Sequence, residues 1–135
     1  MRRYLVLGAV IAFFSFTAAA GTLDRPLPAD AKVLRQSEFS VGASGQVSDI
    51  IIARDGRFTL DYVVAGATPI RTVILTDEQY RQANSGRKPK KPFVMDVAVQ
   101  GSGSQSIRLA TGTYHILWMG DAAAHMSYRA WWQSE

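Results

Sequence analysis

The sequence contains no cysteine, which excludes a fold stapled by disulfides and a lipid-anchored cysteine of the lipoprotein type. In an oxidising compartment such a chain has to draw its stability from packing. It also has no internal repeat, no low-complexity tract and only two histidines. The formal net charge is only +4. That mild excess does not predict a nucleic acid partner.

Long hydrophobic runs are absent except near the start of the chain. Arg2 and Arg3 precede an apolar-to-small stretch, Tyr4–Phe16, and three alanines follow at 18–20. This order is typical of a secretory signal peptide and predicts cleavage after Ala20. A transmembrane anchor is the alternative, but the stretch is shorter than the roughly 20 residues that cross a bilayer. We therefore expect residues 1–20 to be removed and the protein to be periplasmic or secreted. Loss of the two arginines would lower the formal charge from +4 to +2.

In the rest of the chain, turn-forming residues recur at short intervals. Residues 21–32 hold two prolines and few large apolar side chains, which predicts an irregular lead-in. Residues 33–135 are expected to form a single domain. About eight short alternating segments predict an all-β fold, an antiparallel β-sandwich that is jelly-roll-like. A closed barrel is the alternative.

The segment Val47–Val64 has the clearest strand pattern. Asp55-Gly56 at its centre is the favoured dipeptide of a two-residue type I′ hairpin, because both turn positions need positive φ. A hairpin in this register places Asp49 opposite Tyr62. The core face that it predicts consists of Val47, Asp49, Ile51, Ala53, Phe58, Leu60, Tyr62 and Val64.

One segment carries helix signals. Thr76 and Gln79 are spaced as a capping box, and Gly86 suits the end of a helix. These signals predict one short helix over residues 77–85. Further on, GSGSQ at 101–105 predicts a flexible turn.

Residues 109–121 contain another apolar strand. Both of its faces are largely apolar, with Tyr114, Ile116 and Trp118 on one and His115, Leu117 and Met119 on the other. That pattern is typical of a central strand buried on both sides. We interpret this segment as scaffold.

The second half of the chain resembles a known class of domain. Leu109, Gly112, Thr113 and Tyr114 form a turn that opens a strand, and a final strand carries the aromatic residues Tyr128 and Trp132. Over roughly residues 60–132 the chain is similar to bacterial pre-peptidase C-terminal and GOLD-type β-sandwich domains. The resemblance implies a non-enzymatic accessory or interaction module. We expect a free-standing version without a preceding catalytic domain, which would depart from the usual arrangement of these domains.

Residues for metal binding or catalysis are sparse. His115 and His125 fall on the two strands of a predicted final hairpin, where an even register would start a zinc or copper site. Such a site needs a third ligand, and Asp121 is the nearby carboxylate. Ser127 lies about 7 Å along the strand from His125, too far for a hydrogen bond, and no Gly-x-Ser-x-Gly elbow occurs. We expect no enzyme activity and no cofactor. The simpler interpretation of His115 and His125 is that they are ordinary histidines at the surface or rim of the sheet.

A basic loop is the main local charge. It consists of Arg87, Lys88, Lys90 and Lys91. A solvated loop that aids solubility is one interpretation. Contact with an anionic surface, such as lipid headgroups, lipopolysaccharide phosphates or acidic glycans, is the other.

Two adjacent tryptophans near the end of the chain are the other candidates for binding. Trp131 and Trp132 point to opposite faces of a strand, so one belongs in the core. The other is either exposed, as an aromatic anchor for sugar or protein, or covered as part of the structure.

Together these features predict an exported, non-catalytic β-sandwich that binds a partner through the basic loop and one of the two tryptophans. The expected partner is a cell-envelope protein or an anionic envelope component. One alternative is a carbohydrate-binding module that uses an exposed tryptophan. Another is a small metal-binding protein that uses His115 and His125.

Overall fold

The computed structural model describes residues 23–42, 45–66, 68–120 and 124–135. This part of the chain contains eight strands and one short helix: β2 (Lys32–Val41), β3 (Gln46–Ile52), β4 (Gly56–Ala65), β5 (Ile70–Thr76), α3 (Asp77–Asn84), β6 (Met95–Val99), β7 (Ser102–Leu109), β8 (Gly112–Met119) and β9 (Ala124–Gln133). The expected signal peptide, residues 1–20, lies outside the described residues. No helix within the described ranges is long and apolar enough to cross a membrane.

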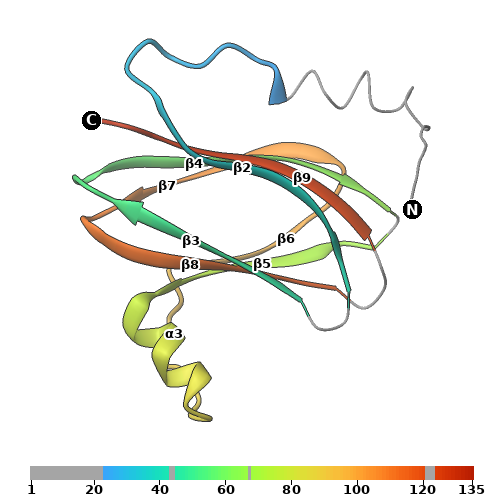
Figure 1. Ribbon diagram of the computed structural model, residues 1–135, viewed down its shortest axis with the longest axis vertical. Helices are drawn as coiled ribbons and strands as arrows, with labels where there is room; N and C mark the ends of the chain where they lie inside the picture. Colours follow the sequence, from blue (N-terminus) through green and yellow to red (C-terminus); the bar gives the residue numbers. More distant parts are fainter. Residues whose placement is uncertain (1–22, 43–44, 67, 121–123) are drawn as a thin grey trace.

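The strands form two antiparallel sheets that face each other (Figure 1). One sheet has the order β2-β9-β4-β7 and the other β3-β8-β5-β6. Consecutive strands alternate between the sheets through most of the chain, as in an eight-stranded jelly roll. The predicted antiparallel β-sandwich with one short helix is therefore confirmed.

The core lies between the two sheets and is rich in aromatic residues. The ring centroid of Trp118 on β8 lies 5.0 Å from that of Phe39 on β2 and 4.7 Å from that of Tyr128 on β9. Other fully buried side chains include Phe58, Leu60, Ile74, Ile116 and Met126. Trp118 and Tyr128 thus connect the two sheets, and the face of β8 that carries Tyr114, Ile116 and Trp118 points into the core.

The predicted hairpin at Asp55-Gly56 is wrong. β3 and β4 lie in different sheets: β3 pairs with β8, whereas β4 pairs with β7 and β9. The turn is a crossover between the sheets, and the Asp55 carboxylate anchors it by accepting hydrogen bonds from the Thr111 N–H at 2.8 Å and hydroxyl at 3.1 Å. These two hydrogen bonds lower the pKa of Asp55.

The missing hairpin also reverses the face predicted for β3. Ile50 and Ile52 point into the core, and Ile51 is 69% exposed on the outer surface. Asp49 lies opposite His115 rather than Tyr62. The face predicted for β4 is correct, because its residues from Phe58 to Val64 that alternate inward are all buried. A further prediction fails at 101–105, where β7 begins at Ser102 and leaves little of the expected flexible turn.

Gly56 starts β4 beside the end of β9, its neighbour in the same sheet. A Cβ atom there would overlap the indole Nε1 of Trp132 and lie 2.6 Å from the carbonyl oxygen of Gln133. We expect Gly56→Ala to lower the free energy of unfolding by about 1–3 kcal/mol, the usual effect of overpacking. Thermal denaturation measures this, with Gly42→Ala as the control because nothing lies within 4 Å of a Cβ there. Equal melting temperatures for the two variants would contradict the expectation.

Candidate functional site

Helix α3 leaves the end of β5 and packs on the outer face of the second sheet, against β5 and β8 (Figure 1). The Thr76 hydroxyl accepts a hydrogen bond from the Gln79 N–H at 3.1 Å, and the Gln79 side-chain oxygen accepts one from the Thr76 N–H at 3.0 Å. This is the predicted capping box. The helix ends at Asn84, and Gly86 follows with φ +83°, a conformation that glycine adopts readily.

The basic loop that follows α3 is tied back to the helix by two glutamines. The side-chain amide of Gln79 donates to the carbonyl oxygens of Lys90 at 2.6 Å and Pro92 at 3.0 Å. The Gln82 side-chain oxygen accepts from the Lys90 N–H at 3.1 Å, and its carbonyl oxygen accepts from the Arg87 N–H. These hydrogen bonds fix the loop backbone near both of its ends, so helix and loop form one unit.

His115 on β8 attaches this unit to the sheet. Its Nδ1 lies 2.8 Å from Asp49 Oδ1 on β3, and its Nε2 lies 2.9 Å from Asp77 Oδ1 on α3. The Tyr80 ring stacks on the imidazole, with 4.0 Å between ring centroids and 14° between planes. His115 is only 7% exposed. We call Asp49, His115 and Asp77 the histidine clamp.

The clamp has a defined protonation requirement. A neutral imidazole carries one N–H, whereas an imidazolium donates from both nitrogens. Both ring nitrogens of His115 face carboxylate oxygens at hydrogen-bond distance, so full pairing of the clamp needs the imidazolium. The hydrogen bond from His115 lowers the pKa of Asp77, with a smaller contribution from the nearby charge of Arg81.

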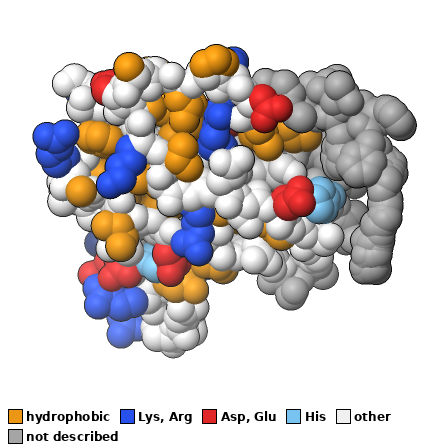
Figure 2. All heavy atoms as spheres, turned by 45° about the horizontal axis from the view of Figure 1, so that its top comes forward, with side chains coloured by type: hydrophobic (Ala, Val, Ile, Leu, Met, Phe, Trp, Pro, Cys, Tyr) orange, Lys and Arg blue, Asp and Glu red, His pale blue; other side chains and the backbone are white. Residues whose placement is uncertain are grey.

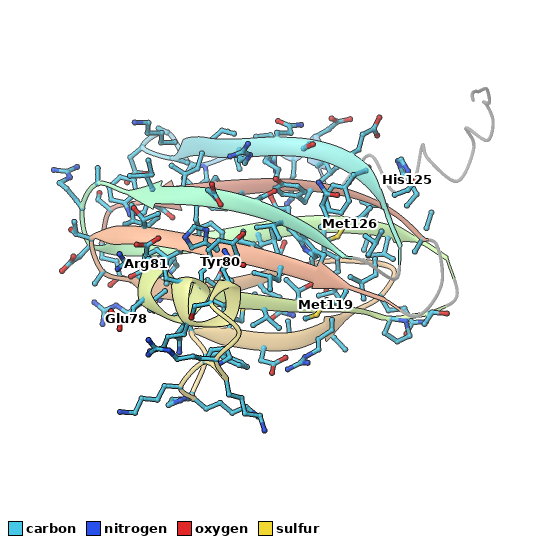
Figure 3. The ribbon with its side chains drawn as sticks, turned by 60° about the horizontal axis from the view of Figure 1, so that its bottom comes forward. Glu78, Tyr80, Arg81, Met119, His125 and Met126 are labelled. Atoms are coloured by element: carbon cyan, nitrogen blue, oxygen red, sulfur yellow. The ribbon has the colours of Figure 1, made fainter. Side chains whose placement is uncertain are left out.

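The four cations predicted as a binding loop are all exposed on this unit. In the described part of the chain, no salt bridge involves Arg87, Lys88, Lys90 or Lys91. Lys91 lies 5.8 Å from the centroid of the Phe93 ring and has a long-range attraction to Asp96. The segment after α3 projects beyond the sandwich with nitrogen-tipped side chains pointing outward (Figure 3). Basic side chains also gather at the lower left of Figure 2, in the region of α3.

The two tryptophans lie elsewhere, on β9 of the first sheet. Trp131 is on the outer face, where its Nε1 donates to Asp61 Oδ2 at 3.0 Å. Trp132 points inward and packs against the core, and the Arg54 guanidinium lies 5.5 Å from its ring centroid. They occupy opposite faces, as the strand pattern requires, and both are half-buried. The structure therefore does not bring the basic loop and the tryptophans together into one site.

The two histidines are not partners. β8 pairs with β3 and β5, and β9 pairs with β2 and β4, so His115 and His125 lie in opposite sheets and the predicted hairpin between them is wrong. His125 Nε2 lies 3.5 Å from Glu38 Oε2. Among the described residues, no group of three or more His, Cys, Asp or Glu side chains is placed to hold a metal ion. Asp121, the expected third ligand, lies outside the described residues.

Sequence reasoning missed a buried charge network on the outer face of the first sheet. Asp61 is fully buried, and its carboxylate accepts hydrogen bonds from the Arg129 guanidinium at 2.8 and 3.2 Å, from the Trp131 indole and from the Ser104 hydroxyl. Arg25 from the lead-in adds an ion pair at 3.5 Å. The available signal was an acid inside the otherwise apolar run FTLDYVV and an arginine inside the last strand.

Comparisons with known proteins do not assign a family. No protein-family model matches the chain, and no curated protein matches it. An endo-1,4-β-D-xylanase structure from Clostridium thermocellum, comprising CBM22-1 and GH10 modules with xylohexaose, aligns with 78% of this chain at 8% identity and a TM-score of 0.38. This chain spans 26% of that one. A structure of the Bacillus endospore appendages, which are disulfide-linked pili, aligns with 83% of this chain at 16% identity and a TM-score of 0.36. The alignment includes 99% of the pilus chain.

At TM-scores this low, neither similarity supports an argument about function. The resemblance to pre-peptidase C-terminal and GOLD-type domains has no matching family model. The β-sandwich that it implied is present in the structure.

Proposed function

We propose that the protein is an exported, non-catalytic binding module that attaches to the phosphate-bearing anionic surface of the cell envelope through α3 and the basic loop. The observation that carries this proposal is the fixed backbone of the loop, which Gln79 and Gln82 hold through hydrogen bonds while four cations point into solvent. Loops that are ordered before binding lose less conformational entropy when they bind. The signal-peptide pattern of residues 1–20 supports the envelope as the location.

The form of the loop favours a surface over an enclosed ligand. It projects from the sandwich, and the space beside it is an open groove lined by polar side chains of α3 together with Arg87. Near an anionic membrane each Lys or Arg contributes about 1 kcal/mol. The four cations of the basic loop together can therefore hold the protein on an anionic membrane without a pocket. This requires an ionic strength at which charges still act over about 10 Å.

The proposal is tested by sedimentation of the protein with vesicles of phosphatidylcholine alone, of phosphatidylcholine with phosphatidylglycerol, and of phosphatidylcholine with lipopolysaccharide. We expect binding to both anionic preparations and none to the neutral one. Binding should weaken steeply between roughly 0.01 and 1 M salt, where the screening length falls from about 30 to about 3 Å. The relative affinity for the two anionic preparations separates phospholipid from lipopolysaccharide as the preferred source of phosphate. Equal binding to neutral vesicles would overturn the proposal.

Charge reversal localises the binding. Lys88→Glu should weaken vesicle binding about 30-fold, because it exchanges an attraction of about 1 kcal/mol for a repulsion of similar size. The control is Arg35→Glu, which reverses a positive charge at an exposed position on β2 of the other sheet. Equal weakening in both variants would mean that net charge, not the loop, governs binding. Salt-insensitive capture of a discrete protein with no vesicle binding would favour a protein partner instead.

A further inference from the structure

A small cavity lies where the edges of the two sheets meet, away from α3 and the basic loop. β2 and β3 are the edge strands here, one from each sheet. The cavity has a volume of about 190 Å³. Its lining consists of Lys32, Leu34, Ile51, Ile52, Ala53, Arg54 and Trp132.

The inner wall of this cavity is apolar. Ile52 is buried, while Leu34 and Trp132 pack against the core. Ile51 lies at the mouth of the cavity. Its side chain is 69% exposed, the highest value among the large hydrophobic side chains of the described residues. Covering such a side chain with an apolar group removes its surface from water, which favours binding by roughly 25 cal/mol per Å². An apolar ligand body therefore suits both the wall and the mouth.

The rim of the cavity carries only positive charge. Lys32 and Arg54 are exposed, and no salt bridge in the described part of the chain involves either of them. No acidic residue is part of the lining. The Arg54 guanidinium lies over the Trp132 ring at 5.5 Å from its centroid. Stacking on an aromatic ring orients the guanidinium, whose N–H groups match a carboxylate in a bidentate pair.

Size and polarity narrow the class of ligand. An engineered cavity of about 150 Å³ lined by apolar side chains binds benzene, so about 190 Å³ accommodates a single ring with a short substituent. A sugar fits the lining poorly, because its hydroxyls need acceptors and no lining side chain carries an oxygen. A long acyl chain exceeds the volume.

We propose that this cavity binds a small carboxylic acid with an aromatic or compact branched body, which rests on Ile52 and Trp132 while its carboxylate pairs with Arg54 and Lys32. The site is separate from the proposed envelope contact, since no lining residue belongs to α3 or to the basic loop.

Benzoate is a suitable probe, and its binding is followed by NMR through the methyl signals of Ile51 and Ala53 and the indole N–H signal of Trp132. We expect saturable shifts that map to these residues. Benzyl alcohol has a similar shape and no charge, and it should bind roughly tenfold more weakly because it cannot form the charge-assisted pair. Shifts that do not saturate, shifts that map elsewhere, or equal affinity for the alcohol would overturn the proposal.

A pair of variants separates the cavity from non-specific attraction to a basic protein. Arg54→Met keeps an apolar side chain on Trp132 and removes the charge, so the preference for benzoate over benzyl alcohol should be lost. Arg57→Met removes the same charge on the other side of the turn, outside the cavity lining, and should leave the preference intact. Both variants are compared by melting temperature with the parent protein to show that they fold. Retention of the preference in Arg54→Met would contradict the assignment.

Discussion

Asp61→Ala is expected to lower the free energy of unfolding by about 3–5 kcal/mol. The carboxylate of Asp61 is fully buried on β4 and is the shared acceptor for Arg129, Trp131 and Ser104. Removing it leaves the buried guanidinium of Arg129 without its partner, and the cost of an unpaired buried charge dominates the loss. Urea denaturation measures the change. Because domains of this size are stable by only about 5–15 kcal/mol, the variant will be marginal.

Two further variants keep this prediction testable if Asp61→Ala does not fold. Trp131→Phe removes one donor to Asp61 and keeps the aromatic ring, so it should cost about 1 kcal/mol. Asp96→Ala breaks the bidentate pair with Arg71 on the other sheet, at 2.7 and 2.9 Å, but both of those side chains are exposed and the loss should be at most about 1 kcal/mol. If Asp61→Ala lowers the free energy of unfolding no more than Asp96→Ala does, burial does not make the Asp61 network more stabilising than an exposed ion pair.

Local signals in the sequence predicted the parts of the fold that depend on neighbouring residues. The capping box of Thr76 and Gln79 and the end of the helix before Gly86 are contained in one short segment, and the structure confirms them. The inward face of β4 is also correct, because the large apolar residues Phe58, Leu60, Tyr62 and Val64 occur at every second position on the face opposite Asp61. In both cases the sequence pattern and the final packing require the same arrangement.

Predictions that depended on which strands pair together failed. Asp55-Gly56 suits a tight hairpin, yet β3 and β4 belong to different sheets, because pairing with β8 and β9 decides where each strand lies. Three consecutive isoleucines at 50–52 fit either face of a strand, so the pattern could not fix which of them point inward. The jelly-roll topology itself follows from pairings between residues far apart in the chain.

The candidate site was predicted in part. The cations of the basic loop are evident from the sequence, whereas the hydrogen bonds from Gln79 and Gln82 that order its backbone are not. The histidine clamp draws one residue each from β3, α3 and β8, and no spacing in the sequence connects them. His115 looked like part of a scaffold strand, and it does belong to one. Its outer face became a docking point because α3 covers it.

Acidification is expected to weaken the docking of α3 and the basic loop on the sheet. The pKa of Asp77 in the folded protein is lowered, mainly by the hydrogen bond from His115, so the carboxylate contributes docking stability above the ordinary pKa of an aspartate, about 3.9. That contribution is lost as the pH falls through the folded value, because the protonated carboxyl no longer offers a charged acceptor to the His115 ring N–H. The observable is the loss of stacking between Tyr80 and His115, followed by their NMR ring signals.

Asp77→Asn should uncouple the docking of α3 from pH in this acidic range. The amide cannot titrate, and it also removes one carboxylate from the histidine clamp, so the contact between Tyr80 and His115 should be weakened at every pH. Glu78→Gln is the matched control: it removes a neighbouring acid that also lies in the first turn of α3, where the helix dipole acts equally, but that has no bond to His115. Persistence of the acidic transition in Asp77→Asn, or its disappearance in Glu78→Gln, would show that another group controls docking. Because the helix and loop form one unit, Asp77→Asn should also weaken binding to anionic vesicles more than Glu78→Gln does, even though both changes make the protein more positive.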